Sequence, residues 1–456
     1  MELWMRVKKK INSSFLKNIG TLLTGTTIAQ LVPIIISPIL TRIFSPEEFG
    51  LLGLYVAITS VLSVFSNARY EMAIVLPRDK QDALDLLKLS LYVAIIFSSS
   101  LLVINTIFNH ELSTILGDKQ IAPYLYFIPI SVLFLGIFKS FNYWNSRERA
   151  YKRLAINRVF QSSSLSGSQV IMGWSNFLGN GLIFGQLFGQ LISSLRLAYI
   201  SIRESKINLV KVNVKNTLRL AKTYKEFPIY STWSSFFNSF SLQLPIFLLT
   251  GYFSSSVVGF YSLSYRFLNL PMNLIGGSVS QVFYQQAAKY YGVSNKKFKN
   301  LTLKTFRNML IIGSIPMSIV FGFGDILFRF IFGEEWEIAG QFSRLLSPSI
   351  LFVFCTSAIT SIYLILGKQK IYLIFDICLL VLRLVALLLG SVVYKEPLLA
   401  VGLYGLAGVI VKLIMLFYTL SIINVRIYIT IAFITTFAVF PFIITLLLRV
   451  FIIGSF

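Results

Sequence analysis

The sequence is poor in charged residues and in the side chains that many enzymes use for catalysis. Only 13% of its 456 residues are charged, about half of the share that is typical of a soluble globular protein. It contains one histidine, His110, and two cysteines, Cys355 and Cys378, which both lie in apolar stretches. A histidine-dependent catalytic triad and a zinc site are therefore almost excluded, and the cysteines are expected to pack rather than to form a disulfide framework.

Nucleotide-binding and metal-binding motifs are also missing. The sequence has no Walker A loop, no GxGxxG element and no cluster of metal ligands. Gly367 and Lys368 lack the preceding glycine and the following serine or threonine of a phosphate-binding loop. We therefore expect a protein that is not an enzyme and that needs no cofactor or metal. Its energy source stays open between protons, sodium and downstream consumption of the product.

Hydrophobic residues, in contrast, make up 55% of the chain and form long stretches separated by short loops. A helix needs roughly 20 apolar residues to cross the hydrocarbon core of a bilayer, and an open sheet cannot satisfy its backbone there. The sequence therefore predicts an all-α integral membrane protein. The thirteen predicted segments are 19–42, 50–68, 84–108, 121–141, 154–174, 181–202, 228–251, 258–284, 305–328, 343–366, 371–394, 399–423 and 427–448.

Basic residues outnumber acidic residues by 41 to 18, and most of them lie in alternate loops. One set of loops holds 31 lysines and arginines, whereas the opposite set holds 6. The positive-inside rule places the richer set, and with it the N-terminus, in the cytoplasm. The net charge of +23 is thus mainly a signal of topology. We expect a multi-pass protein of the bacterial inner membrane that contacts membrane lipids and does not bind nucleic acid.

The chain contains an internal repeat. LTRIFSPEEFGLLGL at 40–54 aligns without gaps on LTGYFSSSVVGFYSL at 249–263, at an offset of 209 residues. Six predicted helices separate the starts of the two copies, and an even number predicts a parallel repeat of two similarly oriented lobes. The predicted domains are an N-terminal six-helix lobe at 1–215, a C-terminal six-helix lobe at 216–425 and an extra transmembrane helix at 426–456.

Charged side chains inside the predicted segments are the candidates for function, because each costs about 2.5–3.5 kcal/mol at the bilayer centre on insertion scales. Arg266 shares a helix face with Asn269 and Asn273, and Pro271 is expected to bend or break the helix there. This polar stripe with one cation is a candidate substrate-binding site. A structural hydrogen bond between helices is the alternative.

Arg383 and Lys412 lie near the middles of two successive segments, and Asp376 comes seven residues before Arg383. A structural network of Asp376 with Lys412 and contact with a ligand both stay open. Cations outnumber carboxylates within the segments, which suits an anion such as the diphosphate of a polyprenyl-linked sugar. A cation exporter would need buried carboxylates instead.

Three further candidate substrate-binding residues, Arg42, Arg69 and Glu71, lie at segment ends. A merely interfacial location is the simpler interpretation of all three. Arg196 lies nearer the cytoplasmic end of its segment, from which its long side chain can extend to the interface. Tyr404 is one of the aromatic residues that could offer a face to a sugar.

Four motifs occur in order along the chain: TRIFSPEEFG at 41–50, RYEMAIVLP at 69–77, YRFLNLP at 265–271 and FGEEWEIAG at 332–340. Together they resemble the bacterial polysaccharide, or O-antigen-type oligosaccharide, flippase family. That family belongs to the multidrug/oligosaccharidyl-lipid/polysaccharide exporter superfamily. The resemblance covers the chain to about residue 425.

The resemblance implies a V-shaped carrier with two lobes and a central cationic cavity that opens alternately to each side. In lipid-flipping relatives, an arginine followed shortly by Leu-Pro on the eighth helix lines this cavity, and Arg266 in YRFLNLP matches it. The peptidoglycan-precursor branch also has arginines in its first helix. The segment 19–41 contains none, which argues against that substrate.

The expected function is therefore a flippase for undecaprenyl-diphosphate-linked oligosaccharide in the synthesis of a surface polysaccharide such as the O-antigen of lipopolysaccharide. Polysaccharide polymerase machinery is an expected partner. A multidrug or cation exporter of the same superfamily is the main alternative. A membrane sugar polymerase or ligase is less favoured, because outward loops such as 252–257 leave no room for a catalytic domain.

Overall fold

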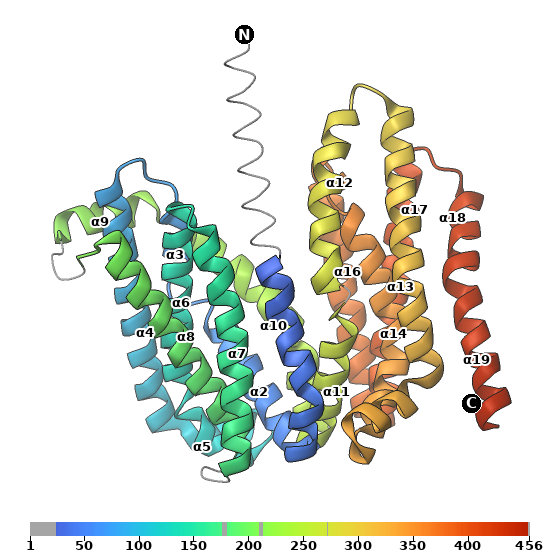
Figure 1. The fold of residues 1–456 in the computed structure, drawn as a ribbon, viewed down its shortest axis with the longest axis horizontal. Coiled ribbons are helices and arrows are strands. Elements are labelled where there is room, and N and C mark those ends of the chain that lie inside the picture. Colours follow the sequence, from blue (N-terminus) through green and yellow to red (C-terminus); the bar gives the residue numbers. More distant parts are fainter. Residues whose placement is uncertain (1–23, 176–179, 209–212, 271, 455–456) are drawn as a thin grey trace. The chain divides into compact units, whose positions relative to one another are not determined.

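The computed structural model describes residues 24–175, 180–208, 213–270 and 272–454, and this part of the chain is helical without any β-strand (Figure 1). Seven of its helices are long and apolar enough to cross a membrane, and the bent pair Lys119–Leu125 and Ile128–Arg147 makes an eighth candidate. The seven are Thr24–Ile43, Lys80–Ile115, Asn295–Phe332, Glu334–Ile365, Gln369–Tyr394, Pro397–Ile422 and Ile427–Ile452.

The predicted segments overlap, within the described residues, with helices or with helices that are locally broken, but residues 63–68 of the segment 50–68 form turns. Several are shorter or more polar than a standard span. For example, α2 (Pro46–Leu62) has 17 residues, and the segment 258–284 is divided into α11 (Ser255–Leu268), a π-turn (Met272–Gly276) and α12 (Gly277–Tyr290). The expected break at Pro271 falls on a residue outside the described ones, but α11 ends just before it at Leu268. Thirteen crossings therefore stay a prediction.

The chain forms two compact units. Unit 1 comprises residues 1–44 and 51–251, and unit 2 comprises residues 45–50 and 252–456. The boundary between the two units lies at the end of α10 (Thr232–Tyr252), whereas the sequence predicts a lobe boundary at residue 215. The lobe limits taken from the repeat stay a prediction.

Unit 1 is built around α4, α6, α7 and α8. Leu86, Phe141 and Leu197 bring α4, α6 and α8 into one buried cluster, and Tyr55 joins α2 to α6 by a 2.6 Å hydrogen bond with Ser131. Its described elements are Thr24–Ile43, α2 from residue 51 onward (its first turn, 46–50, belongs to unit 2), α3 (Tyr70–Ala73), α4 (Lys80–Ile115), η1 (Lys119–Ile121), α5 (Ala122–Leu125), α6 (Ile128–Arg147), α7 (Tyr151–Ser175), α8 (Gly181–Ser205), α9 (Val214–Thr223), η2 (Phe227–Ser231) and α10 (Thr232–Tyr252).

Unit 2 is built around α13 and α14, which pack along their lengths, with α17 and α11 against α14. Phe306, Phe342 and Phe354 are fully buried at this centre. Its elements are α11 (Ser255–Leu268), η3 (Met272–Gly276), α12 (Gly277–Tyr290), α13 (Asn295–Phe332), η4 (Glu334–Trp336), α14 (Glu337–Ile359), α15 (Ile362–Ile365), α16 (Gln369–Leu388), η5 (Leu389–Tyr394), α17 (Pro397–Ile422), α18 (Ile427–Ile434), η6 (Thr435–Val439) and α19 (Phe440–Ile453).

The two copies of the repeat meet at their first helical turns. A Cβ atom on Gly50 would lie 1.7 Å from the backbone oxygen of Ser255, and one on Gly259 would lie 1.9 Å from that of Pro46. The offset of 209 residues makes Pro46 equivalent to Ser255 and Gly50 equivalent to Gly259, so the contact is reciprocal. Only glycine allows two backbones to approach this closely.

The C-terminal helix α19 runs beside α13 along unit 2 (Figure 1) and is attached by a buried ion pair. Arg449 donates to both carboxylate oxygens of Asp325, at 2.7 and 2.6 Å, and to the backbone oxygen of Gly322 at 2.9 Å. Arg344 of α14 adds a third contact to Asp325, at 3.3 Å. The extra helix is therefore anchored to the core of unit 2.

Arg449→Ala is expected to destabilise the protein strongly, because it leaves the Asp325 carboxylate with Arg344 as its single cationic partner among the described residues. Breaking a buried pair by removing one partner costs about 3–5 kcal/mol. Thermal unfolding of the purified protein in detergent would measure the loss. Arg329→Ala, which removes an exposed surface pair with Glu334, is the control and should cost much less. Equal unfolding midpoints for the two variants would contradict the anchoring role.

Candidate functional site

Charged and aromatic side chains gather inside unit 2 on three helices. Asp376 and Arg383 lie on α16, Tyr404 and Lys412 lie on α17, and Ser349 lies on α14. We call these five residues the unit 2 cluster. All of them lie within helices that are apolar enough to cross a membrane.

Arg383 is positioned by an aromatic ring and a hydroxyl group. Its guanidinium carbon lies 4.4 Å from the centroid of the Tyr404 ring, and its Nη2 lies 3.5 Å from the Oγ of Ser349. Its Nε is buried and has no hydrogen-bond partner among the described residues. Cation–π stacking orients the guanidinium without neutralising its charge, so Arg383 keeps both charge and donors for an anion.

Gly408 makes room for this arrangement. A Cβ atom at Gly408 would lie 2.1 Å from the Oγ of Ser349 and 2.8 Å from Nη2 of Arg383. A larger residue at this position would displace the two groups that face each other there. The position of Arg383 thus depends on a glycine one turn away from both Tyr404 and Lys412 on α17.

Lys412 is buried and lies 4.0 Å from the carboxylate of Asp376, at the outer limit of an ion pair. Its Nζ also lies 3.8 Å from the sulfur atom of Met415. The Asp376 side chain is 43% exposed, whereas that of Lys412 is 10% exposed. Asp376 therefore balances one of the two cations, and the unit 2 cluster has a formal charge of +1.

Two tyrosines of α11 extend the aromatic wall. The Tyr261 ring meets the Tyr404 ring edge to face, with centroids 6.3 Å apart, and stacks on the Tyr265 ring at 5.7 Å. Tyrosine rings and hydroxyls are groups that can contact a sugar. Tyr261 and Tyr265, unlike Tyr404, are not among the residues predicted from the sequence, because an aromatic residue in an apolar helix is indistinguishable there from a packing residue.

Arg266 lies in the last turn of α11 with an exposed side chain. Among the residues that the structure describes, it forms no hydrogen bond or ion pair. Asn269, expected on the same face, donates instead to the backbone oxygen of Tyr265 at 2.7 Å and so completes the end of the helix. The side chain of Asn273 lies outside the described ones. Within the described residues Arg266 is therefore not bonded to Asn269, and its grouping with Asn273 stays a prediction.

Arg69 and Glu71 lie in unit 1, where α2 has ended at Leu62 and α3 begins at Tyr70. Arg69 has a left-handed backbone (φ 61°), and its guanidinium lies 3.7 Å from Glu71, whose exposure is only 1%. Lys139 extends from α6 and donates to the backbone oxygen of Ser63 at 2.5 Å. Glu71 is thus enclosed by the protein.

Arg42, the remaining candidate, lies exposed near the end of the helix Thr24–Ile43. The structure gives it no ion pair with any described residue. Among the seven candidate substrate-binding residues whose side chains the structure describes, only Arg383 and Lys412 come together in one cluster, and only Arg69 and Glu71 form an ion pair.

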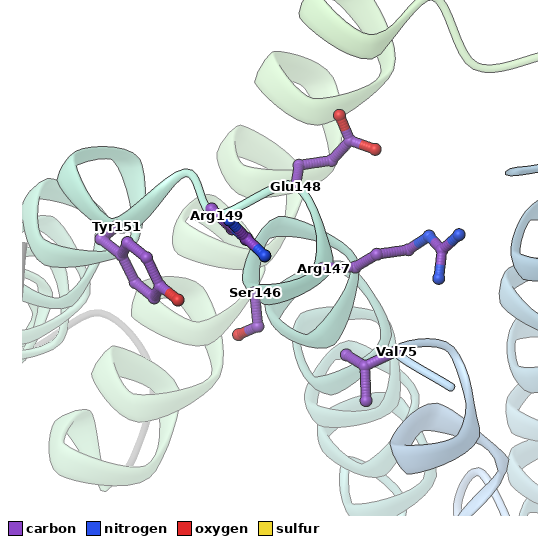
Figure 2. A pocket seen from close by; sticks show the side chains of 6 residues that line it. All are labelled: Val75, Ser146, Arg147, Glu148, Arg149 and Tyr151. Carbon is purple, nitrogen blue, oxygen red and sulfur yellow. The ribbon is translucent and has the colours of Figure 1, made fainter. Parts of the chain in front are cut away.

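A pocket of about 530 Å³ lies at the turn between α6 and α7 (Figure 2). Figure 2 shows Arg147 extended away from Tyr151. The Arg147 guanidinium donates to four backbone oxygens of the loop before α4, those of Ile74, Pro77, Arg78 and Asp79. Because its donors hold this loop in place, we assign Arg147 to the fold and not to substrate binding.

Comparison with known proteins places the chain in a family. The model of a family described as "Polysaccharide biosynthesis protein" matches residues 39–340. The succinoglycan biosynthesis transport protein ExoT of Rhizobium meliloti (strain 1021) is 23% identical over 331 residues, 72% of this chain. The chain spans 63% of the length of that relative.

Solved structures define the fold. The lipid II flippase MurJ in an inward closed conformation matches 93% of this chain and 96% of its own, with a TM-score of 0.69 and 14% identity. An outward-facing multidrug resistance MATE family transporter matches 90% and 97%, with a TM-score of 0.54 and 14% identity. The fold is therefore that of the membrane transporters to which MurJ and MATE proteins belong. The chain belongs to the polysaccharide biosynthesis protein family.

Proposed function

We propose that this protein is a flippase that moves undecaprenyl-diphosphate-linked oligosaccharide across the bacterial inner membrane by alternating access, with its N-terminus in the cytoplasm. The family match and the ExoT relative support a role in polysaccharide biosynthesis, and the MurJ likeness supports a fold suited to lipid flipping. The destination of the product would be a polysaccharide polymerase.

The observation that carries the proposal is the net positive charge of the unit 2 cluster within the apolar helices. Arg383 and Lys412 would contact the diphosphate, because a guanidinium and an ammonium together match its charge. Tyr404 and Tyr261 would face the first sugar. Arg266 would hold a phosphate oxygen as the carrier changes conformation. No covalent step is needed, since the substrate crosses unchanged.

The MATE likeness supports a multidrug or cation exporter as the second candidate. The sign of the cluster distinguishes the two. A cation would be repelled by Arg383 and Lys412, and Asp376 already has Lys412 as a neighbour at 4.0 Å.

Reconstitution of the purified chain in liposomes tests the proposal. We expect a polyprenyl-diphosphate oligosaccharide to change leaflets and a lipophilic cation not to be transported. Arg383→Ala should slow lipid movement by tenfold or more, because a hydrogen bond to a charged group contributes about 1.5–3 kcal/mol. Arg383→Lys keeps the charge but not the stacking on Tyr404, and should be intermediate. Transport of the cation, with no movement of the lipid, would favour the exporter.

A further inference from the structure

A second cationic site lies in unit 1, on the surface of α7 and α8 and apart from the unit 2 cluster. A pocket of about 370 Å³, a volume typical of small-ligand sites, opens between the first turns of α7 and the last turns of α8. We call it the α7–α8 groove. Its lining includes Lys152, Arg153, Ile156, Arg196, Ile200 and Glu204.

The charges of the groove are already partly arranged. Arg153 is paired with Glu204, the single carboxylate among the lining residues, and it also donates to Asn145 at 2.6 Å. Lys152 is exposed and has no ion pair among the described residues. Because Glu204 balances the charge of Arg153, the other two cations of the lining, Lys152 and Arg196, have no carboxylate partner within the groove.

Arg196 is held in a fixed orientation. Its Nη1 donates to the Oδ1 of Asn157 at 3.1 Å, and its guanidinium carbon lies 4.2 Å from the centroid of the Phe160 ring. Neither partner carries a charge. The guanidinium is therefore preorganised with donors left for an anion, in the same way as Arg383 in unit 2.

Exposed apolar residues lie on the same two helices as the groove. On α8, Ile192, Leu195 and Tyr199 are 42%, 49% and 63% exposed, and Ile156 on α7 is 47% exposed. The positions 192, 195 and 199 recur at helical spacing, so they form one stripe along α8 that flanks Arg196. A ligand that fits this surface has an anionic head and apolar chains.

The level of the groove in the bilayer agrees with such a ligand. Arg196 lies nine residues before the end of α8 at Ser205, about 13 Å along the helix at 1.5 Å per residue. Lys152 lies at the start of α7. Both belong to the end of unit 1 that the count of basic residues places on the cytoplasmic side. Basic pockets between transmembrane helices on that side bind the headgroups of anionic lipids.

We propose that the α7–α8 groove binds an anionic phospholipid of the cytoplasmic leaflet. Lys152 and Arg196 contact the headgroup phosphate, and the stripe of Ile192, Leu195 and Tyr199 contacts an acyl chain. This lipid is a resident partner of the protein and not its transported substrate.

Native mass spectrometry of the purified full-length chain tests the proposal. Phosphatidylglycerol and phosphatidylethanolamine with identical acyl chains would be titrated, with undecaprenyl diphosphate as a third probe. We expect wild type to retain phosphatidylglycerol in preference to phosphatidylethanolamine. Each cation near the surface contributes about 1 kcal/mol, so Lys152→Gln and Arg196→Gln should each weaken this binding about fivefold. Arg196→Lys should retain most of it.

Lys222→Gln is the matched control, because Lys222 is an exposed lysine of α9 outside the groove. It should bind phosphatidylglycerol as wild type does, and equal thermal unfolding midpoints would verify that every variant is folded. Unchanged binding in the Lys152→Gln, Arg196→Gln double variant would overturn the proposal. A groove that retains undecaprenyl diphosphate but not phosphatidylglycerol would also overturn it and would assign these residues to the substrate. Neither outcome depends on whether the protein flips lipid.

Discussion

Arg266→Ala is expected to abolish export of the polysaccharide while the protein remains at near-normal abundance in the membrane. The Arg266 side chain is exposed at the end of α11 and has no bonded partner among the described residues, so its removal leaves no buried group unsatisfied. Substitutions of this kind usually change stability by less than about 0.5 kcal/mol. An arginine is costly in the bilayer, so we attribute the expected loss of export to the proposed contact between Arg266 and a phosphate of the substrate. Surface polysaccharide and membrane abundance, measured in the same cells, provide the two readouts.

Arg307→Ala is the matched control for Arg266→Ala, because Arg307 is another exposed arginine of unit 2. It lies near the start of the predicted segment 305–328, after a stretch rich in lysine, and its loss should leave export intact. Arg266→Lys distinguishes charge from geometry: partial export indicates that charge dominates, and little export indicates that the planar fork is needed. Wild-type export by a stable Arg266→Ala protein would end the proposal for this residue. A parallel loss of abundance and export would assign it to packing.

The helices could be predicted from the sequence because a bilayer demands long apolar stretches, but their ends could not. The predicted segment 84–108 belongs to a helix of 36 residues, Lys80–Ile115, and 305–328 belongs to one of 38, Asn295–Phe332. Both helices extend beyond the apolar part and begin at capping side chains. Asp79 accepts from the backbone of Asp82, and Ser294 accepts from that of Lys297. Such caps lie outside a hydropathy pattern.

The charged residues of the candidate site could be predicted from the sequence, but the uncharged residues that contact them could not. Arg383 and Lys412 were conspicuous as cations in apolar segments, and the proximity of Asp376 to Lys412 was one of the two open interpretations. Ser349 and Gly408 gave no signal, because small residues in a membrane helix usually serve packing.

Contacts of basic side chains with residues far away in the sequence could not be predicted either. Arg449 directly follows the predicted segment 427–448, yet it bonds Asp325, 124 positions earlier. Lys139 lies near the end of the predicted segment 121–141, yet it bonds Ser63, 76 positions earlier. A count of basic residues treats every lysine and arginine near a helix end as solvated, so it cannot recognise those that hold helices together.

The second large effect is expected at the contact between the two copies of the repeat. Gly50→Ala would place a Cβ atom 1.7 Å from the backbone oxygen of Ser255, and Gly259→Ala would place one 1.9 Å from that of Pro46. Cβ atoms do not occur this close to a backbone oxygen, so the first turns of α2 and α11 must separate. Overpacking of this kind typically costs 1–3 kcal/mol and sometimes more. We expect each variant to lower membrane abundance and the unfolding midpoint in detergent.

Gly277→Ala is the control, because a Cβ atom there has no neighbour within 4 Å and the helical backbone of α12 accepts alanine. It should be neutral or slightly stabilising, since alanine favours a helix by about 1 kcal/mol over glycine. Because the two close approaches are reciprocal, the double variant gives a further test of the shared contact. Once one Cβ atom has pushed the turns apart, the second meets less resistance. The combined loss of stability in Gly50→Ala, Gly259→Ala should therefore be clearly smaller than the sum of the two single losses. Strict additivity would mean that the two glycines act at independent sites, and would contradict a shared contact between the repeats.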